Sequence, residues 1–280
     1  MSYPYDVAQH GAGPIAGSEL PVRRISVGSA AFVSDIHANT YAFEAVLADL
    51  EREPVDALVL TGDITWGTFP ARTCDLIRAA HQRFRHVVLI RGNGDRAVLE
   101  LADRVREPRR PREQWMFEAH RPADVELLHT ALFQIDVEVA GLGVIRACHG
   151  SPRADIETIT PGTPIERLAE ATAGVEADLL LTGHTHLQFD RPLTGLPRIR
   201  RSVNPGSAGI PYGASERGAY WLRVDGGRLE FRRSDYDFDA YVAEMVAVGD
   251  PRADAVADLL RQPPSVEEIT KECEELVFAD

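Results

Sequence analysis

Cysteine is scarce in this chain of 280 residues, which has only Cys74, Cys148 and Cys273. They stand far apart and form no Cys-x-x-Cys pair, which argues against a disulfide scaffold and fits a reducing cytoplasm. No apolar run approaches the roughly 18 residues that a membrane span requires. The N-terminus has neither the basic nor the apolar region of a secretory signal. We therefore expect a cytoplasmic protein that does not associate with membranes.

Positive charge is also in short supply. The net charge is −13, and residues 235–280 hold 13 acidic against 3 basic residues, so the acidity is concentrated at the C-terminal end. Binding to duplex nucleic acid therefore has no electrostatic support. A nuclease acting on single strands would need a basic groove with stacking aromatic residues. The one arginine-rich stretch contains only the aromatic residues Trp115 and Phe117.

The rest of the composition is that of a soluble globular protein, with 44% hydrophobic and 26% charged residues. Residues 1–24 are rich in glycine and proline, and we expect them to form a mobile tail. Residues 25–232 hold the alternating apolar and amphipathic stretches of a main domain. Residues 233–280 form an acidic C-terminal segment, which we expect to be helical and to pack on that domain.

Apolar runs and helical periodicities alternate along the chain. Strands are predicted at Ala30–Ser34, Ala57–Thr61, Val87–Arg91, Phe133–Val139, Val144–Cys148, Asp178–Thr182, Ile199–Val203, Ala219–Val224 and Arg228–Arg232. Helices are predicted at Tyr41–Glu51, Arg72–Arg83, Ala97–Arg106, Glu113–Leu128, Pro164–Ala173, Phe238–Val248 and Ala253–Arg261. The first elements have the order βαβαβ, which predicts parallel strands with helices on the faces. We therefore expect an α/β (α+β) fold in which two sheets pack face to face.

Polar side chains follow five of the predicted strands at the point where each strand ends. In open α/β sheets, ligands bind at the carboxyl ends of the strands. The residues at these ends belong to types that commonly bind metal ions: Asp35, His37, Asp63, Asn93, His149, His184 and His186. Their carboxylate, imidazole and amide groups suit Mn, Fe, Zn, Co or Ni better than a Cys-rich structural zinc site.

The spacing of these residues supports a shared metal centre. In an extended segment, residues i and i+2 point to the same side, so Asp35 and His37 can face one metal, as can the two histidines of Gly-His-Thr-His. Asp63 can bridge two cations with its two oxygens. Each motif alone has an ordinary alternative. Asp35 would make a good helix N-cap, and Asn93 lies in an Asn-Gly sequence that usually forms a tight turn.

Taken in order, the strings Asp-x-His, Gly-Asp, Gly-Asn, His-Gly and Gly-His-Thr-His resemble the calcineurin-like metallophosphoesterase superfamily. An Asn-Pro-Gly-Ser turn at residues 204–207 follows them, as it does in that family. The resemblance covers about residues 25–232 and is most similar to prokaryotic branches of small phosphodiesterases and phosphatases. It implies a four-layer αββα sandwich, in which two mixed β-sheets are flanked by helices.

The resemblance also implies a centre of two divalent metal ions, with manganese favoured. The first metal would be held by Asp35, His37, Asp63 and His186. The second would be held by Asp63, Asn93, His149 and His184. The implied reaction is hydrolysis of a small phosphoester, with diesters preferred to monoesters. Two cations roughly 3.5–4 Å apart would clamp the phosphate while a metal-bridging hydroxide attacks in line.

Further site residues are expected around this centre. Asp63 and Asn93 would take part in catalysis, and Asp95 would orient a ligand or a neighbouring loop. Asn39 and Arg96 would contact the substrate, and Arg96 would also assist catalysis. Many arginines lie in residues 97–130, which we call the cap segment. They form either a solvated face or a cap whose guanidinium forks bind the substrate phosphate.

One position departs from the family pattern. Many phosphatases of this superfamily carry a histidine directly after the asparagine, where it resembles a general acid, but this chain has Gly94. Loss of general acid catalysis, typically worth about 10²–10⁴-fold, would penalise substrates with poor leaving groups most. We therefore predict leaving-group-dependent activity, with a water molecule, His120 or His129 as alternative sources of the proton.

Other functions stay open at this point. Some members of the superfamily are assembly scaffolds, as its retromer subunit is, and a scaffold could lose its metal ligands freely. Here all seven expected ligand positions are filled, which favours bound metal. A phosphomonoesterase would use the same centre, and the acidic C-terminal segment leaves a homodimer open.

Overall fold

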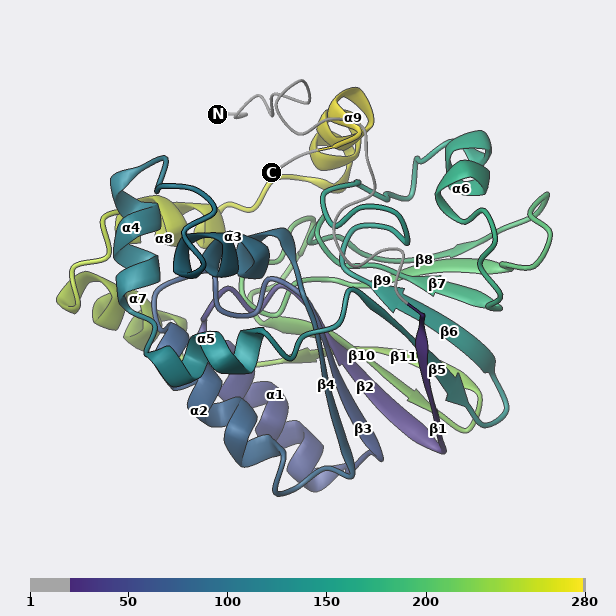
Figure 1. Ribbon diagram of the computed structural model, residues 1–280, viewed down its shortest axis with the longest axis horizontal. Helices are drawn as coiled ribbons and strands as arrows, with labels where there is room; N and C mark the ends of the chain where they lie inside the picture. The colour runs from purple at the N-terminus through teal and green to yellow at the C-terminus, as the bar shows by residue number, and fades with distance from the viewer. Residues whose placement is uncertain (1–20, 279–280) are drawn as a thin grey trace.

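Two mixed β-sheets form the centre of the computed structural model, which describes residues 21–278 (Figure 1). The five-stranded sheet has the order β11-β10-β2-β3-β4, with β2 at Ser29–Val33, β3 at Ala57–Thr61, β4 at His86–Ile90, β10 at Ala219–Asp225 and β11 at Arg228–Ser234. The six-stranded sheet has the order β1-β5-β6-β7-β9-β8, with β1 at Arg23–Val27, β5 at Gln134–Val139, β6 at Gly143–Cys148, β7 at Leu179–Leu181, β9 at Arg201–Pro205 and β8 at Gln188–Pro192. Residues 1–20 of the expected tail lie outside the described residues.

The strands β2, β3 and β4 are parallel and are joined by two helices, α1 (Thr40–Arg52) and α2 (Pro70–Ala80). All five residues of β3 are buried, as expected for a parallel strand covered on both faces. In α1 the buried residues include Phe43, Val46, Leu47 and Leu50, which repeat at the spacing of one helix face. The predicted βαβαβ unit is therefore confirmed.

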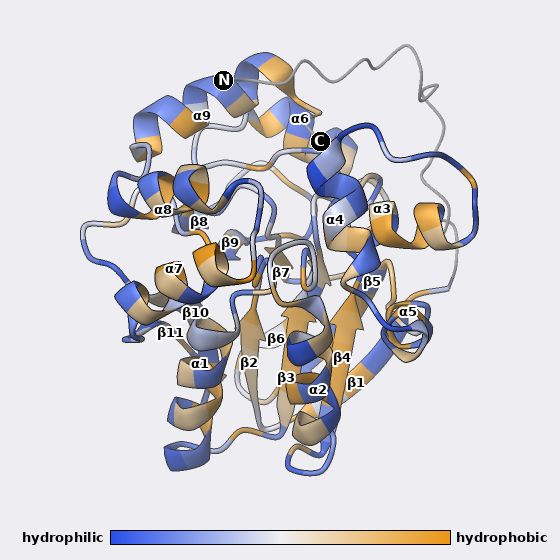
Figure 2. Ribbon diagram, turned by 90° about the vertical axis from the view of Figure 1, so that its left-hand side faces the viewer, coloured by the Kyte–Doolittle hydropathy of each residue, from blue (hydrophilic) through white to orange (hydrophobic). Residues whose placement is uncertain are grey.

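The layers follow from three apolar clusters. Between the sheets, Phe32 and Val59 of one sheet pack with Val137 and Ile145 of the other. α1 and α2 cover the outer face of the five-stranded sheet. The outer face of the six-stranded sheet is covered by the short helix α6 (Ile165–Ala171) and by loops. Figure 2 shows the strands β2, β3 and β4 in hydrophobic colours, with helices of mixed colour around them. The predicted αββα sandwich is confirmed, although its fourth layer is thin.

The cap segment contains the end of α3 (Asn93–Ala102) and the whole of α4 (Pro111–Glu118) and α5 (Pro122–Leu128). The prediction of one helix over residues 113–128 is wrong, because α4 ends before Pro122 and α5 begins there. Proline lacks the N–H that a continuing helix needs but suits the first turn of a new one. α3 begins at Asn93 rather than at Ala97, so the expected metal ligand lies in the first turn of a helix.

The C-terminal segment adds α7 (Phe238–Ala247), α8 (Ala253–Arg261) and α9 (Val266–Leu276). α7 and α8 bury Tyr241, Met245 and Val256 in an apolar cluster with Tyr41 and Phe69. The turn between α7 and α8 contacts α4 of the cap segment, because Arg112 of α4 donates to Asp250. Among residues 21–278, no helix combines the length and the apolar character that a membrane crossing requires.

Three elements, β1, β8 and α9, are absent from the sequence-based prediction. β1 and β8 are edge strands whose residues are mostly exposed or half-buried, so they lack an apolar run. β1 also begins at Arg23, slightly before the expected domain boundary at residue 25. α9 is held by polar contacts, such as those of Glu274 with Thr160 and Arg167. The two edge strands therefore leave little hydrophobic periodicity in the sequence. α9, in contrast, is amphipathic and begins with a capping box of Ser265 and Glu268, so the sequence did contain a signal for it.

Candidate metal centre

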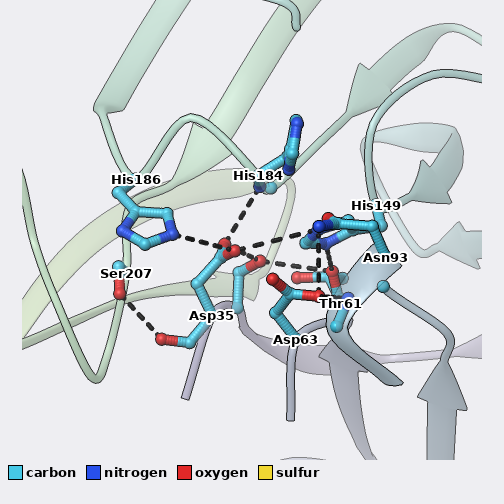
Figure 3. A network of polar contacts seen from close by, with 12 residues as sticks. Asp35, Thr61, Asp63, Asn93, His149, His184, His186 and Ser207 are labelled. Atoms are coloured by element: carbon cyan, nitrogen blue, oxygen red, sulfur yellow. Dashed lines mark hydrogen bonds and ion pairs between the residues drawn. The ribbon is translucent and has the colours of Figure 1, made fainter. Parts of the chain in front are cut away.

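The carboxyl ends of strands from both sheets converge on one polar cluster (Figure 3). The loops after β2, β3 and β4 supply the acidic and amide groups, and the loops after β6 and β7 supply most of the histidines. We call six of the residues that meet there the ligand cluster: Asp35, His37, Asp63, Asn93, His149 and His186. Ligand atoms of Asp35, His37 and His186 all lie within 4.8 Å of one another, and so do those of Asp35, Asp63 and His149.

His37 and His186 face each other through the same ring atom. Nδ1 of His37 lies 3.0 Å from the Trp66 carbonyl, and Nδ1 of His186 lies 2.7 Å from the Ile210 carbonyl. A carbonyl oxygen only accepts hydrogen bonds, so Nδ1 carries the hydrogen and the lone pair of a neutral ring is on Nε2. The two Nε2 atoms are 3.1 Å apart. Two lone pairs at this distance repel unless a cation lies between or beside them.

His149 repeats this arrangement on the other side of the cluster. Its Nδ1 donates to the Thr61 carbonyl at 2.9 Å, which leaves a lone pair on Nε2. That Nε2 lies 3.1 Å from Oδ1 of Asn93 and 3.5 Å from Oδ1 of Asp63. Acceptor atoms therefore converge on a second point, which again favours a cation.

The carboxylates of Asp35 and Asp63 add oxygen atoms to the histidine pair and to the group around His149. Oδ1 of Asp35 is buried and has no hydrogen-bond partner among residues 21–278. It lies 3.4 Å from Nε2 of His186. Asp63 turns its two oxygens to opposite sides, with Oδ2 3.8 Å from Nε2 of His37 and Oδ1 3.5 Å from Nε2 of His149. An orphaned carboxylate oxygen and a carboxylate placed between two sets of donors fit a pair of divalent cations.

The pKa shifts in the cluster differ from residue to residue. Burial lowers the pKa of His149, but Asp63 and Asp35 raise it by more. Burial raises the pKa of the Asp35 carboxyl, but the combined effect of His186, His149 and His37 lowers it by more, so the net shift is downward. Burial raises the pKa of Asp63. Burial and the neighbouring His186 lower the pKa of His37, which favours the neutral ring that binds metals.

The backbone is strained at the ligand positions. Positive φ angles occur at Asp35 (51°), His37 (48°), Asp63 (47°), His184 (66°) and His186 (58°). Non-glycine residues rarely adopt this conformation, and each instance costs about 1–3 kcal/mol. The expectation that i, i+2 pairs converge through extended backbone is therefore wrong. Asp35 and His37 come together through left-handed turns instead.

His184 is the expected ligand that the structure does not bring into the cluster. Its ring packs against that of His149 with centroids 5.0 Å apart, and in Figure 3 it points away from Asp35. Its backbone N–H donates to Oδ2 of Asp35 at 3.1 Å. Its imidazole lines the same cavity as the cluster.

Asp95 lies outside the cluster and holds two of its loops. Its fully buried carboxylate accepts from the backbone N–H groups of Ile64, Thr65 and Gly92 at 3.0–3.1 Å. These bonds tie the loop after β3 to the loop after β4. The structure therefore makes Asp95 a positioning residue and not a group that touches the reacting atoms.

The Asn-Pro-Gly-Ser turn also holds the loops. Ser207 Oγ donates to the backbone carbonyl of Asp35 at 2.7 Å, and Asn204 Nδ2 donates to the carbonyl of Gly183 at 2.8 Å. Both side chains are fully buried. The turn thus links a loop of one sheet to a loop of the other.

The structure corrects the substrate role expected for Asn39. Its side chain is fully buried and caps α1, where Oδ1 accepts from the N–H of Ala42 at 3.1 Å. Its Nδ2 donates to the Gly209 carbonyl and to the Tyr236 hydroxyl. All of these contacts are internal, so Asn39 orients the loop after β2 rather than a substrate.

The roles expected for Arg96 are corrected as well. Nε and Nη2 of Arg96 form a fork with Asp155 at 2.7 and 3.3 Å, and Nη1 donates to Glu100 at 2.8 Å. Burial opposes ionisation, but Asp155 and Glu100 raise the pKa of the guanidinium. The guanidinium of Arg96 is thus engaged in internal ion pairs and does not contact the substrate site. Arg106 and Arg121 of the cap segment are likewise paired with carboxylates.

Trp66 fills the space where a side chain at position 94 would lie. A Cβ at Gly94 would lie 2.6 Å from Cβ and 2.7 Å from Cγ of Trp66. The N–H of Gly94 donates to Oδ1 of Asp63 at 2.7 Å, so the backbone at this position is also in use. Steric exclusion by Trp66 accounts for the absence of the expected histidine.

The histidines considered as substitute proton donors lie elsewhere. His120 is held between the Thr65 hydroxyl (3.0 Å from Nε2) and the Met116 carbonyl (2.9 Å from Nδ1). His129 is 48% exposed, with Nε2 3.5 Å from Oδ1 of Asp103. Neither is among the residues of 21–278 that line the cavity at the cluster. The structure therefore does not support either as the proton donor.

A cavity of about 280 Å³ opens over the ligand cluster. Its lining beyond the metal-binding residues was not apparent from sequence, because the residues come from loops and helices far apart in the chain: Trp66, Gly67, Thr68, Arg112, Ile210, Tyr212, Tyr241 and Val256. Tyr212 stacks on the ring of His186 with centroids 4.7 Å apart. The cavity thus has a polar floor and largely apolar walls, and Arg112 also lines it.

Several known proteins resemble this chain in sequence or in fold. Residues 29–227 match the model of the calcineurin-like phosphoesterase superfamily domain. A Methanothermobacter thermautotrophicus protein named "Probable metallophosphoesterase" is 28% identical over 174 residues, which is 61% of this chain and 90% of that protein. The crystal structure of a Sphaerobacter thermophilus metallophosphoesterase superposes with a TM-score of 0.64 at 23% identity, covering 83% of this chain and 98% of that one. The Escherichia coli phosphoesterase YfcE gives a TM-score of 0.44 at 22% identity, over 72% of this chain and 90% of its own.

Proposed function

This chain belongs to the calcineurin-like phosphoesterase superfamily, and from its ligand cluster we propose that it is a metal-dependent phosphoester hydrolase that prefers diesters. The observation that carries the proposal is the convergence of acceptor atoms. Nε2 of His37 faces Nε2 of His186, and Nε2 of His149 faces oxygens of Asn93 and Asp63. An extra proton on one imidazole of each pair would also resolve these contacts, but a cation accounts for both of them together with the carboxylates.

The donor set fits two divalent cations, with Asp63 between them. When bound, such ions would lower the pKa of a water molecule and clamp the phosphate oxygens. Asp35, His37, Asp63 and His186 would hold one ion, and Asp63, Asn93 and His149 the other. His184, which lines the cavity, would join the second set after rotation of its ring. Manganese is the first metal to test, because oxygen and imidazole donors are mixed here.

The chain's own residues set the rest of the chemistry. The carbonyls of Trp66, Ile210 and Thr61 fix the ring orientation of His37, His186 and His149. Gly94 offers no side chain to protonate the departing oxygen. Substrates whose alcohol leaves as a stable anion should therefore react faster.

The preference for diesters rests on the walls of the cavity. A phosphomonoester needs space only for one alcohol, whereas a diester carries a second group that must lie next to the metal site. Trp66, Ile210, Tyr212 and Val256 supply an apolar surface for such a group. This placement supports a diester and leaves a monoester as the second candidate.

The test combines metal analysis with turnover. We expect purified protein incubated with Mn²⁺ to retain about two ions per chain and to hydrolyse bis(p-nitrophenyl) phosphate faster than p-nitrophenyl phosphate. Asp63→Asn should lose bound metal and at least about 100-fold in rate, since it replaces the carboxylate shared by both ions with a neutral amide that has only one donor oxygen. Asp103→Asn, which removes an exposed carboxylate at 53% exposure, is the matched control.

The outcomes separate the candidate functions. If the monoester is hydrolysed faster, the proposed activity changes from phosphodiesterase to phosphomonoesterase. No bound metal and no turnover, with Asp63→Asn behaving as wild type, would favour a non-catalytic interaction protein and refute the proposal.

A further inference from the structure

Arg112 differs from Arg96, Arg106 and Arg121 because its side chain lines the cavity over the ligand cluster. It comes from α4, in the cap segment. Nε and Nη2 donate to the two oxygens of Asp250, each at 2.9 Å. The remaining nitrogen, Nη1, has no hydrogen-bond partner among residues 21–278, and the side chain is 26% exposed. Asp250 therefore fixes one edge of the guanidinium of a residue that lines the cavity.

Asp250 is built to hold this arginine in place. Its side chain is fully buried, and it also accepts from the Thr68 hydroxyl at 2.7 Å and from the N–H of Arg252 at 2.8 Å. Burial raises the pKa of Asp250, but the hydrogen bonds and the charge of Arg112 lower it by more, so the carboxylate stays ionised. Thr68 belongs to the loop that follows Asp63. Asp250 thus connects the cap segment, the metal-site loop and the C-terminal segment.

We propose that Arg112 binds the substrate phosphate, and that Asp250 of the C-terminal segment holds Arg112 in position for it. The proposal rests on the proposed function, because the phosphate must also reach the metal site. A guanidinium is suited to this task since it keeps its charge and donates in a fixed geometry. A bidentate carboxylate on its far edge removes most of the side-chain freedom that binding would otherwise cost.

The proposal gives the C-terminal segment a function. The family match ends at residue 227, whereas Asp250 and two residues of the cavity wall, Tyr241 and Val256, lie beyond it. The substrate site is thus completed by a part of the chain outside the matched domain. Of the acidic residues of this segment, Asp250 contacts a residue that lines the cavity, and its buried charge is balanced by Arg112.

The experiment measures phosphate binding directly, so that it does not depend on turnover. Inorganic phosphate is titrated by calorimetry into Mn²⁺-loaded wild type, Arg112→Ala, Arg112→Lys, Asp250→Asn and Arg106→Ala, with metal content and Tm measured for each. Arg106→Ala is the matched control, because it removes a cap arginine paired with Glu100 and Glu113 that does not line the cavity. KM and kcat for bis(p-nitrophenyl) phosphate are measured in parallel.

We expect Arg112→Ala to weaken phosphate binding roughly 10- to 100-fold, the loss of one charge-assisted hydrogen bond. KM should rise by more than kcat falls, and metal content should stay unchanged. Arg112→Lys and Asp250→Asn should give smaller losses, because a charge remains but its position is less fixed. Arg106→Ala should bind phosphate as wild type does.

Two results would overturn the role of Arg112. One is unchanged phosphate affinity in a folded, metal-loaded Arg112→Ala protein, and the other is no phosphate binding by the wild type. Failure of the proposed function looks different. If the wild-type protein binds phosphate through Arg112 but hydrolyses no ester, the role of Arg112 in phosphate binding stands and the proposed hydrolase function is refuted.

Discussion

At the scale of single residues, the sequence and the structure give different information about the glycine at position 94. The sequence identifies Gly94 as the place where a proton donor is missing, and predicts a preference for good leaving groups. The structure adds the reason, because Trp66 lies where a side chain at position 94 would begin. Trp66 also lines the cavity. One aromatic residue thus excludes the histidine and forms a wall of the candidate substrate site.

This relation predicts a coupling between the two positions. Gly94→Ala should lower the free energy of unfolding by about 1–3 kcal/mol, the usual cost of overpacking. In a Trp66→Gly background the same change should cost much less, because Cβ and Cγ of Trp66, which the new Cβ meets at 2.6 and 2.7 Å, are both removed. A double-mutant cycle by urea denaturation measures the coupling. Equal costs in the two backgrounds would show that Trp66 is not the obstacle.

The residues of the metal cluster could be anticipated because each lies in a short motif at a strand end. Asn39 and Arg96 were expected at the site only because they are near it in sequence. Their side chains are taken by partners that no local pattern reveals, such as Gly209 for Asn39 and Asp155 for Arg96. Arg112 and Asp250 are 138 residues apart in the chain and meet only through the tertiary fold.

At the scale of elements, prediction succeeded where burial imposes a periodic pattern. β3 was predicted at its observed bounds, and α1 to within a residue at each end, because both lie against the core. The break between α4 and α5 was missed although Pro122 marks it. The contacts at this break are ionic: Asp124 at the start of α5 accepts from Arg121 and from Arg78 of α2. Charged contacts of this kind have no sequence period.

The Asp124 contacts give a prediction with a defined pH dependence. Its side chain is fully buried, and burial raises its pKa while the bonds from Arg121 and Arg78 lower it below the usual value. Asp124→Asn should lower the free energy of unfolding at pH 7 by about 2–4 kcal/mol, because two guanidinium groups lose their shared carboxylate. Glu126→Gln, an exposed change on the same helix, should have little effect.

The sign of the pH effect follows from the depressed pKa. The carboxylate stabilises the fold at every pH above the unfolded-state pKa of about 3.9. That stabilisation is lost as the pH falls through the lower pKa of the folded state. Urea unfolding of wild type and Asp124→Asn should therefore give a constant difference between pH 5 and 8 and a shrinking one below about pH 4. A difference that does not change with pH would exclude ionisation of Asp124 as its source.

At the scale of the whole molecule, the candidate metal centre joins the two sheets. Asp35, Asp63 and Asn93 follow strands of the five-stranded sheet, whereas His149 and His186 follow strands of the six-stranded sheet. Without cations, the donor atoms facing each other across this junction repel, and the strained loops that carry them lose their main compensation. The centre should therefore stabilise the sandwich as well as bind substrate.

Removal of metal should accordingly lower the stability of the entire fold. Free Mn²⁺ at about 100 times its dissociation constant contributes about 2.7 kcal/mol to the folded state. For a chain of this size, that contribution raises Tm by roughly 5–10 °C relative to protein treated with a chelator. The shift should be much smaller in Asp63→Asn, whose neutral amide keeps only one donor oxygen, and unchanged in Asp103→Asn. Thermal unfolding followed by circular dichroism, with and without chelator, measures it. If chelation leaves the Tm of the wild type unchanged, or shifts that of Asp63→Asn equally, the two sheets are not joined through a bound metal.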